Sequence, residues 1–145
     1  GVKIDIFGNM WEKCKQKTHS NLNIKYQDLI GKNYVETIYH SKITLGFLRK
    51  INNDTQTSRS FEIPAVGGFM LMERTDDHLR IFEEGKEAEF FNDNEELLKK
   101  IRYYLNHDGL RESIAKNGFL KVKKSGYYFE NLVDRMMEKI NNENL

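Results

Sequence analysis

The sequence is poor in cysteine, proline and long apolar runs, and each shortage excludes a class of protein. Its single cysteine, Cys14, cannot form a disulfide within the chain, so we expect a reducing, cytoplasmic compartment. No apolar run approaches the roughly 20 residues that span a bilayer, and no secretory signal is visible. The four histidines are scattered without metal-ligand spacing, so we expect no metal site.

The composition that remains is that of one soluble globular domain with a sizeable core. The 145 residues are 39% hydrophobic and 31% charged, and their net charge of +1 predicts neither nucleic-acid binding nor a strongly acidic partner. Because Gly1 leads directly into a predicted strand, we expect a single domain, residues 1–145, cut from a longer chain.

Apolar patterns predict strands and helices that alternate along most of the chain. This order is typical of an α/β fold in which a parallel sheet of about five strands is covered by helices on both faces. The predicted strands are residues 2–8, 24–26, 42–48, 68–72 and 87–91. The predicted helices are residues 33–41, 76–85, 93–105, 109–118 (ended by Gly118) and a last amphipathic helix, 127–142. Asp93, with Glu96 three residues later, predicts a capping-box-like start of the helix 93–105.

The loop "RKINNDTQTSRS" (49–60), with the helix it leads into, is the predicted site. It follows the strand that ends near Leu48, and ligands of parallel α/β sheets sit beyond the carboxyl ends of the strands. We expect a short helix through about Val66, whose N-terminus suits a phosphate. Pro64 keeps that helix short, and Gly67-Gly68 turns the chain into the next strand.

Several side chains of this segment can bind an anionic, hydroxyl-bearing ligand. Thr57, Ser58 and Ser60 offer hydroxyl donors, and Arg59 can hold two anionic oxygens with its planar fork. Glu62 could accept the paired hydroxyls of a ribose. The alternative is structural, because hydroxyl residues before a helix are ordinary caps and a glutamate in its first turn favours the helix dipole.

Other residues were weighed for the same role. Gly8 and Asn9, in "FGNMW" (7–11), follow the first strand and could line the same opening. His78 and His107 lie at the edges of predicted helices, so we expect both at the surface.

Three segments resemble a known family: "SKITLGFLRK", "TSRSFEIPAVGGFMLMERTDDHLRIFEEGKEAEFF" and "EELLKKIRYYLNHDGLRESIAKNG". They are similar to the C-terminal domain of group-1 glycosyltransferases of the spore-maturation-protein type, which have the two-domain GT-B architecture. The resemblance covers about residues 33–135. It implies a Rossmann-like domain that binds the nucleoside-diphosphate sugar donor.

The resemblance also implies roles for single residues. Glu62 matches the second of two acids, eight positions apart, that bracket the donor, and is expected to hold the ribose hydroxyls. Asp54 stands at the position of the first acid, near the donor sugar, where the family usually has glutamate. Arg59 and Thr57 match the family's T-x-R-x-F-E stretch and would face the diphosphate, with Arg59 as the main neutralising charge.

The implied reaction is transfer of a sugar from the nucleotide sugar to an acceptor, without metal or other cofactor. In such enzymes the acceptor site and any catalytic base come chiefly from an N-terminal GT-B domain that this sequence does not contain. Residues 1–145 alone are therefore expected to be inactive. The alternative is a non-catalytic Rossmann-like module that binds a nucleotide or a protein; a phospho-signalling domain is disfavoured because no acidic cluster ends the first strand.

Overall fold

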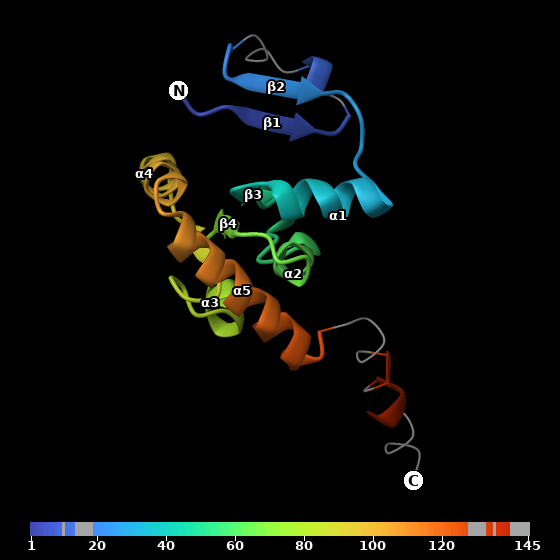
Figure 1. Cartoon of the computed structure of the whole chain (residues 1–145). Coiled ribbons are helices and arrows are strands. Elements are labelled where there is room, and N and C mark those ends of the chain that lie inside the picture. The colour runs from blue at the N-terminus through green and yellow to red at the C-terminus, as the bar shows by residue number, and fades with distance from the viewer. Residues whose placement is uncertain (10, 14–18, 128–132, 135, 140–145) are drawn as a thin grey trace. The chain divides into compact units, whose positions relative to one another are not determined.

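The computed structural model divides the chain into two compact units, Gly1–Thr37 and Ile38–Leu145 (Figure 1). It describes residues 1–9, 11–13, 19–127, 133–134 and 136–139. Each unit is a parallel α/β arrangement, which confirms the predicted fold class as Rossmann-like. The described strands form a two-stranded and a three-stranded sheet, so neither sheet has the five strands predicted.

The first unit contains two paired strands, β1 (Ile4–Phe7) and β2 (Leu22–Lys25). They run parallel with Ile4 beside Leu22 and Ile6 beside Ile24. A short 3-10 helix, η1 (Trp11–Lys13), follows β1. Helix α1 (Gly31–His40) begins in this unit, and its last residues belong to the second unit. The strand predicted around Ile24 is thus confirmed, beginning two residues earlier than expected.

The sheet of the second unit has the order β3-β4-β5, with all three strands parallel. The strands are β3 (Thr44–Gly46), β4 (Met70–Glu73) and β5 (Glu89–Phe91). The central strand forms the middle of the core, because Met70, Leu71 and Met72 are at most 1% exposed. A run of consecutive apolar residues is what a parallel strand needs when both faces of its sheet are covered.

Four helices and one short 3-10 helix connect and cover these strands. The 3-10 helix is η2 (Lys50–Asn52), and the helices are α2 (Arg59–Ala65), α3 (Asp76–Ile81), α4 (Asn94–Leu105) and α5 (Asp108–Ser125). Helix α2 packs on α5 (Figure 1). It also packs against the sheet, whereas α4 packs beside β5. Asp93 accepts the Glu96 N–H at 2.8 Å, which confirms the predicted N-cap of α4.

Gly118 does not end a helix, which corrects a sequence-based prediction. It is buried inside α5, seven residues before that helix ends. A Cβ at this position would lie 2.4 Å from the Glu87 carbonyl oxygen and 3.3 Å from the Pro64 Cβ. The missing side chain therefore allows α5 to approach the turn before β5 and the proline of α2. In contrast, Gly67 has φ +84° just after α2, as predicted for a turn that only glycine adopts readily.

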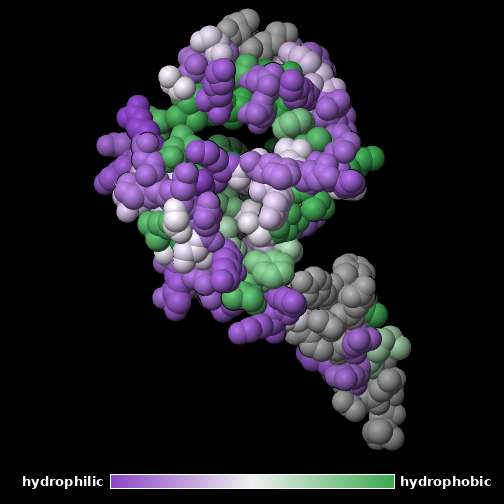
Figure 2. Space-filling model, viewed as in Figure 1, coloured by the Kyte–Doolittle hydropathy of each residue, from purple (hydrophilic) through white to green (hydrophobic). Residues whose placement is uncertain are grey.

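The last predicted helix, 127–142, lies partly outside the described residues. Residues 133–134 and 136–139 are helical, and Tyr127 packs its ring 4.9 Å from that of Phe61. Hydrophilic residues dominate the surface seen in Figure 2. Among the described residues, no helix has both the length and the apolar character needed to cross a membrane.

Candidate functional site

The β3–α2 loop (residues 47–58) leaves the carboxyl end of β3, as predicted, and is held against the end of the neighbouring strand β4. The Leu48 N–H donates to the Glu73 carboxylate at 2.7 Å, and Lys50 Nζ lies 3.9 Å from the same group. Farther along the loop, the Thr75 hydroxyl donates to the Thr55 carbonyl at 2.8 Å. These bonds fix both halves of the loop at the sheet edge where ligands of parallel α/β folds bind.

Helix α2 presents two of the predicted ligand residues, Arg59 and Glu62, to solvent. Residues three apart in a helix are neighbours on one face, so the cation and the carboxylate share a side of α2. Ser58, just before the helix, is also exposed, whereas Asp54 and Thr57 are half-buried. A guanidinium and a carboxylate thus lie three residues apart in the chain, where the loop joins the helix.

Ser60 occupies a different position from the other predicted ligand residues. Its side chain is fully buried, and its hydroxyl lies 2.8 Å from His78 Nε2 and accepts the Thr57 N–H at 3.1 Å. A hydroxyl with these partners supports the loop from inside, and a direct contact of Ser60 with the ligand stays a prediction. The Thr57 hydroxyl oxygen is also enclosed, and it has no hydrogen-bond partner within the described part of the chain.

His78 is fully buried, so the prediction that it lies at the surface is wrong. Its ring stacks on Phe90 at 5.1 Å between centroids, with 4° between the planes. Nδ1 lies 2.9 Å from the Glu73 carbonyl oxygen, which can only accept, so Nδ1 carries the proton. Burial lowers the pKa of His78 and outweighs the opposing effects of the Glu73 carbonyl and Asp77, so the imidazole is neutral at pH 7.

Gly8 and Asn9 lie in the first unit, at the end of β1. Gly8 has φ +129°, a conformation that residues with a side chain rarely adopt, and its N–H donates to the Gln27 carbonyl at 2.9 Å. The Asn9 amide donates to Asp28 at 2.5 Å. The turn after β1 is therefore tied to the segment after β2, and its proposed part in the same site as residues 54–62 stays a prediction.

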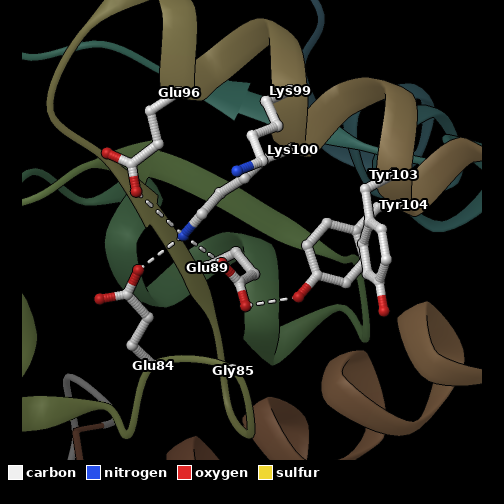
Figure 3. A pocket seen from close by; sticks show the side chains of 8 residues that line it. All are labelled: Glu84, Gly85, Glu89, Glu96, Lys99, Lys100, Tyr103 and Tyr104. Atoms are coloured by element: carbon white, nitrogen blue, oxygen red, sulfur yellow. Dashed lines mark hydrogen bonds and ion pairs between the residues drawn. The ribbon is translucent and has the colours of Figure 1, made fainter.

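A second group of charged residues, which the sequence reasoning missed, lies beside the edge strand β5. We call it the ionic cluster: Arg74, Glu84, Glu89, Glu96 and Lys100. Its members other than Arg74 line a pocket of about 350 Å³ between α4 and the turn before β5, to which Tyr103 and Tyr104 also contribute (Figure 3). The signal in the sequence was a glutamate, Glu89, inside a predicted strand of the sheet, because a charge that becomes buried in a sheet requires partners.

Every member of the ionic cluster is paired with another. Arg74 forms two hydrogen bonds with each of two carboxylates, Glu84 (2.5 and 2.9 Å) and Glu96 (2.7 and 2.9 Å). Lys100 Nζ donates to Glu84 at 2.7 Å and to Glu89 at 2.5 Å (Figure 3).

The same two cations donate hydrogen bonds to the backbone at the outer edge of β5. Lys100 Nζ lies 2.6 Å and Arg74 NH2 3.2 Å from the Phe90 carbonyl oxygen. That carbonyl belongs to a strand with a partner on one side only. Its hydrogen-bonding capacity is therefore met by side chains in place of another strand.

These contacts set the ionisation of the cluster. The hydrogen bond from Arg74 lowers the pKa of Glu96 to about 2. Burial acts to raise the pKa of Glu84, but its bonds to Arg74 and Lys100 outweigh that effect and lower it. Burial and the 2.5 Å bond to Glu89 raise the pKa of the Tyr104 hydroxyl, which stays protonated as a donor. Because its two cations form hydrogen bonds with all three carboxylates, we interpret the ionic cluster as a structural feature that stabilises the fold.

The described residues contain no group of three histidine, cysteine or acidic side chains that could hold a metal ion. In a comparison with protein families, residues 1–138 match a family described as glycosyl transferase-like. No curated protein and no solved structure matches the chain.

Proposed function

This chain belongs to the glycosyl transferase-like family, and we propose that its second unit binds a nucleoside-diphosphate sugar through the β3–α2 loop and the exposed side of α2. Family membership supports a role in glycosyl transfer. The single observation that carries the finer proposal is the placement of Arg59 and Glu62, both exposed and three residues apart, where the loop at the carboxyl edge of the sheet enters α2.

In the proposed complex each exposed group has a separate part of the donor to hold. Arg59 grips oxygens of the diphosphate, because a guanidinium matches two anionic oxygens side by side. Glu62 accepts hydrogen bonds from the vicinal hydroxyls of the ribose. Asp54, eight residues before Glu62 on the half-buried part of the loop, lies near the donor sugar. Thr57 and Ser58 complete the proposed contacts of the second unit. A part of Gly8 and Asn9 in donor binding stays a prediction, which the titration below tests.

The chemistry assigned to these residues is electrostatic. During transfer the bond between the anomeric carbon and the diphosphate oxygen breaks, and an acceptor oxygen bonds to that carbon while losing its proton to a base. Negative charge grows on the departing diphosphate, so a guanidinium already in place stabilises the transition state more than the ground state. We assign that role to Arg59. The acceptor site and the base belong to a partner GT-B domain in this proposal.

A titration tests the binding half of the proposal. UDP, GDP, ADP, TDP and the corresponding nucleotide sugars are added to ¹⁵N-labelled protein, and amide shifts are followed. We expect shifts at residues 54–62 and 8–11 for one base, with the nucleotide sugar distinguished from the bare diphosphate. A response that is flat at millimolar ligand would contradict the proposal. Equal binding of sugar and bare diphosphate would favour a non-catalytic nucleotide-binding module.

Matched substitutions sharpen this titration. Arg59→Gln should weaken binding about 10- to 100-fold, since a hydrogen bond to a charged group contributes about 1.5–3 kcal/mol. Glu62→Gln should weaken nucleoside binding and leave inorganic diphosphate unaffected. Arg102→Gln and Glu95→Gln alter exposed residues of α4, so they control for charge alone and should leave the affinity unchanged.

A further inference from the structure

A series of buried hydrogen bonds supports the proposed donor loop, and we call it the hydrogen-bond chain: Glu73, His78, Ser60 and Thr57. Its donors and acceptors can be arranged in only one way. The His78 Nδ1–H donates to the Glu73 carbonyl at 2.9 Å, which leaves Nε2 as an acceptor. The Ser60 hydroxyl, 2.8 Å away, must therefore donate its proton to Nε2. The lone pairs of the same hydroxyl accept the Thr57 N–H at 3.1 Å. The position of each proton in the hydrogen-bond chain therefore follows from its two ends, a carbonyl that can only accept and an N–H that can only donate.

Among the described residues, the side chains of the hydrogen-bond chain have no alternative hydrogen-bond partners in their buried surroundings. His78 and Ser60 are both fully buried, so water cannot replace a lost partner at either side chain. Stacking on Phe90 of β5 fixes the plane of the imidazole. The backbone N–H of His78 donates to the Thr75 hydroxyl at 3.1 Å, and that hydroxyl in turn donates to the Thr55 carbonyl. The start of α3 thus holds the loop at two points.

Two hydrogen bonds between Thr57 and Ser60 enclose the residues that carry the proposed ligand contacts. Thr57 N–H bonds to the side chain of Ser60, while Ser60 N–H bonds to the Thr57 carbonyl at 3.0 Å. Ser58 and Arg59 lie between these two anchors. Their backbone is consequently fixed from both sides, and with it the origin of the Arg59 side chain.

We propose that His78 is a positioning residue of the donor site: through Ser60 it sets the backbone of residues 57–60 and thereby the position from which Arg59 reaches the diphosphate. For the identity of the ligand this inference rests on the proposed function. The positioning itself depends only on the buried chain.

The first test needs no ligand. Long-range ¹H–¹⁵N spectra of the imidazole at pH 7 should show His78 with a protonated Nδ1 and an unprotonated Nε2. Ser60→Ala should shift the Thr57 amide resonance, because that amide loses its acceptor. A protonated Nε2, or a Thr57 amide that does not respond, would overturn the inference while leaving donor binding possible.

The second test measures affinity for the nucleoside diphosphate that the wild-type protein binds most tightly among UDP, GDP, ADP and TDP. Ser60→Ala and His78→Phe, which keeps a ring on Phe90, should each weaken binding about 2- to 10-fold, the range of one neutral hydrogen bond. The double variant should lose no more than the worse single variant, because both remove the same chain.

A control separates positioning from general loss of stability. Tyr104→Phe removes a buried hydrogen bond to Glu89, in the ionic cluster, and should leave the affinity within about twofold. Equal weakening in Tyr104→Phe, or unchanged affinity in both chain variants, would overturn the inference. A wild-type protein that binds none of the four diphosphates would overturn the proposed function, and the imidazole and Thr57 signals would still decide whether His78 fixes the loop.

Discussion

The β3–α2 loop and the ionic cluster belong to the same unit but differ in how their charged side chains are placed. In the cluster, two cations and three carboxylates lie within hydrogen-bonding distance of one another beside the edge strand β5. Figure 3 shows Lys100 among the three carboxylates. At residues 57–60 of the loop, the side chains that hold the backbone from inside, Ser60 and His78, are neutral, and Arg59 and Glu62 are exposed. The paired charges of the cluster stabilise the fold, whereas the exposed charges of α2 are the ones that we propose contact a ligand.

The largest expected effect comes from removing one arginine from each region by the same substitution. Arg74→Gln leaves Glu84 and Glu96 without their two-pronged partner and should lower the free energy of unfolding by about 3 kcal/mol. Arg59→Gln alters an exposed residue and should change it by less than about 0.5 kcal/mol. Urea denaturation of both variants measures the difference. Similar losses in the two variants would mean that the regions do not differ as described.

Two glycines of α5, Gly118 and Gly109, test whether the close packing of α5 holds α2 in place. In Gly118→Ala the new methyl group would lie 2.4 Å from the Glu87 carbonyl oxygen, so α5 must move away from the turn and from Pro64. We expect a loss of about 1–3 kcal/mol despite the better helix propensity of alanine. Gly109→Ala is the control: it meets no atom within 4 Å and should be neutral or stabilising by up to about 1 kcal/mol.

Thermal unfolding followed by circular dichroism measures both glycine variants. If Gly118→Ala were as stable as Gly109→Ala, the close approach of α5 would contribute nothing, and Gly118 would be an ordinary helical residue. Amide shifts confined to α2, α5 and the turn around Glu87 in Gly118→Ala would locate the disturbance at the predicted contact.

The contrast between the regions also explains what the sequence could predict. Local signals were sufficient for the N-cap at Asp93, for the turn at Gly67 and for the placement of the loop after β3, because each depends on residues close in the chain. The i, i+3 relation of Arg59 and Glu62 is likewise local. These features follow from periodicity and turn chemistry, which operate over a few residues.

The errors all involve partners far apart in the sequence. His78 stands among charged residues in "DDHLR" and reads as exposed, but Ser60, 18 residues earlier, and Phe90 enclose it. Gly118 reads as a helix stop until the Glu87 carbonyl, 31 residues earlier, is brought against it. The ionic cluster joins residues 10–22 positions apart around Arg74. Which charges meet is decided by the packing of the sheet, which single-sequence patterns do not specify.

The smallest expected effect is the pH dependence of stability that the buried His78 should produce near pH 6. The folded-state pKa of His78 lies below its ordinary value of about 6.5, because burial disfavours the charged form. Below pH 6.5 the unfolded chain therefore takes up a proton that the folded chain does not. The free energy of unfolding should then fall as the pH is lowered towards the folded-state pKa, by at most about 1.4 kcal/mol per pH unit from this group.

Comparison of His78→Phe with the wild type isolates this contribution, since the other three histidines are present in both proteins. Urea denaturation between pH 7.5 and 5 should give a shallower pH dependence for the variant, even though its stability at pH 7.5 is lower. Parallel curves would show that His78 takes up its proton equally in both states, which is incompatible with a buried imidazole that accepts the Ser60 hydroxyl proton. A neutral His78 would then no longer distinguish the support beneath the loop from the charged cluster beside β5.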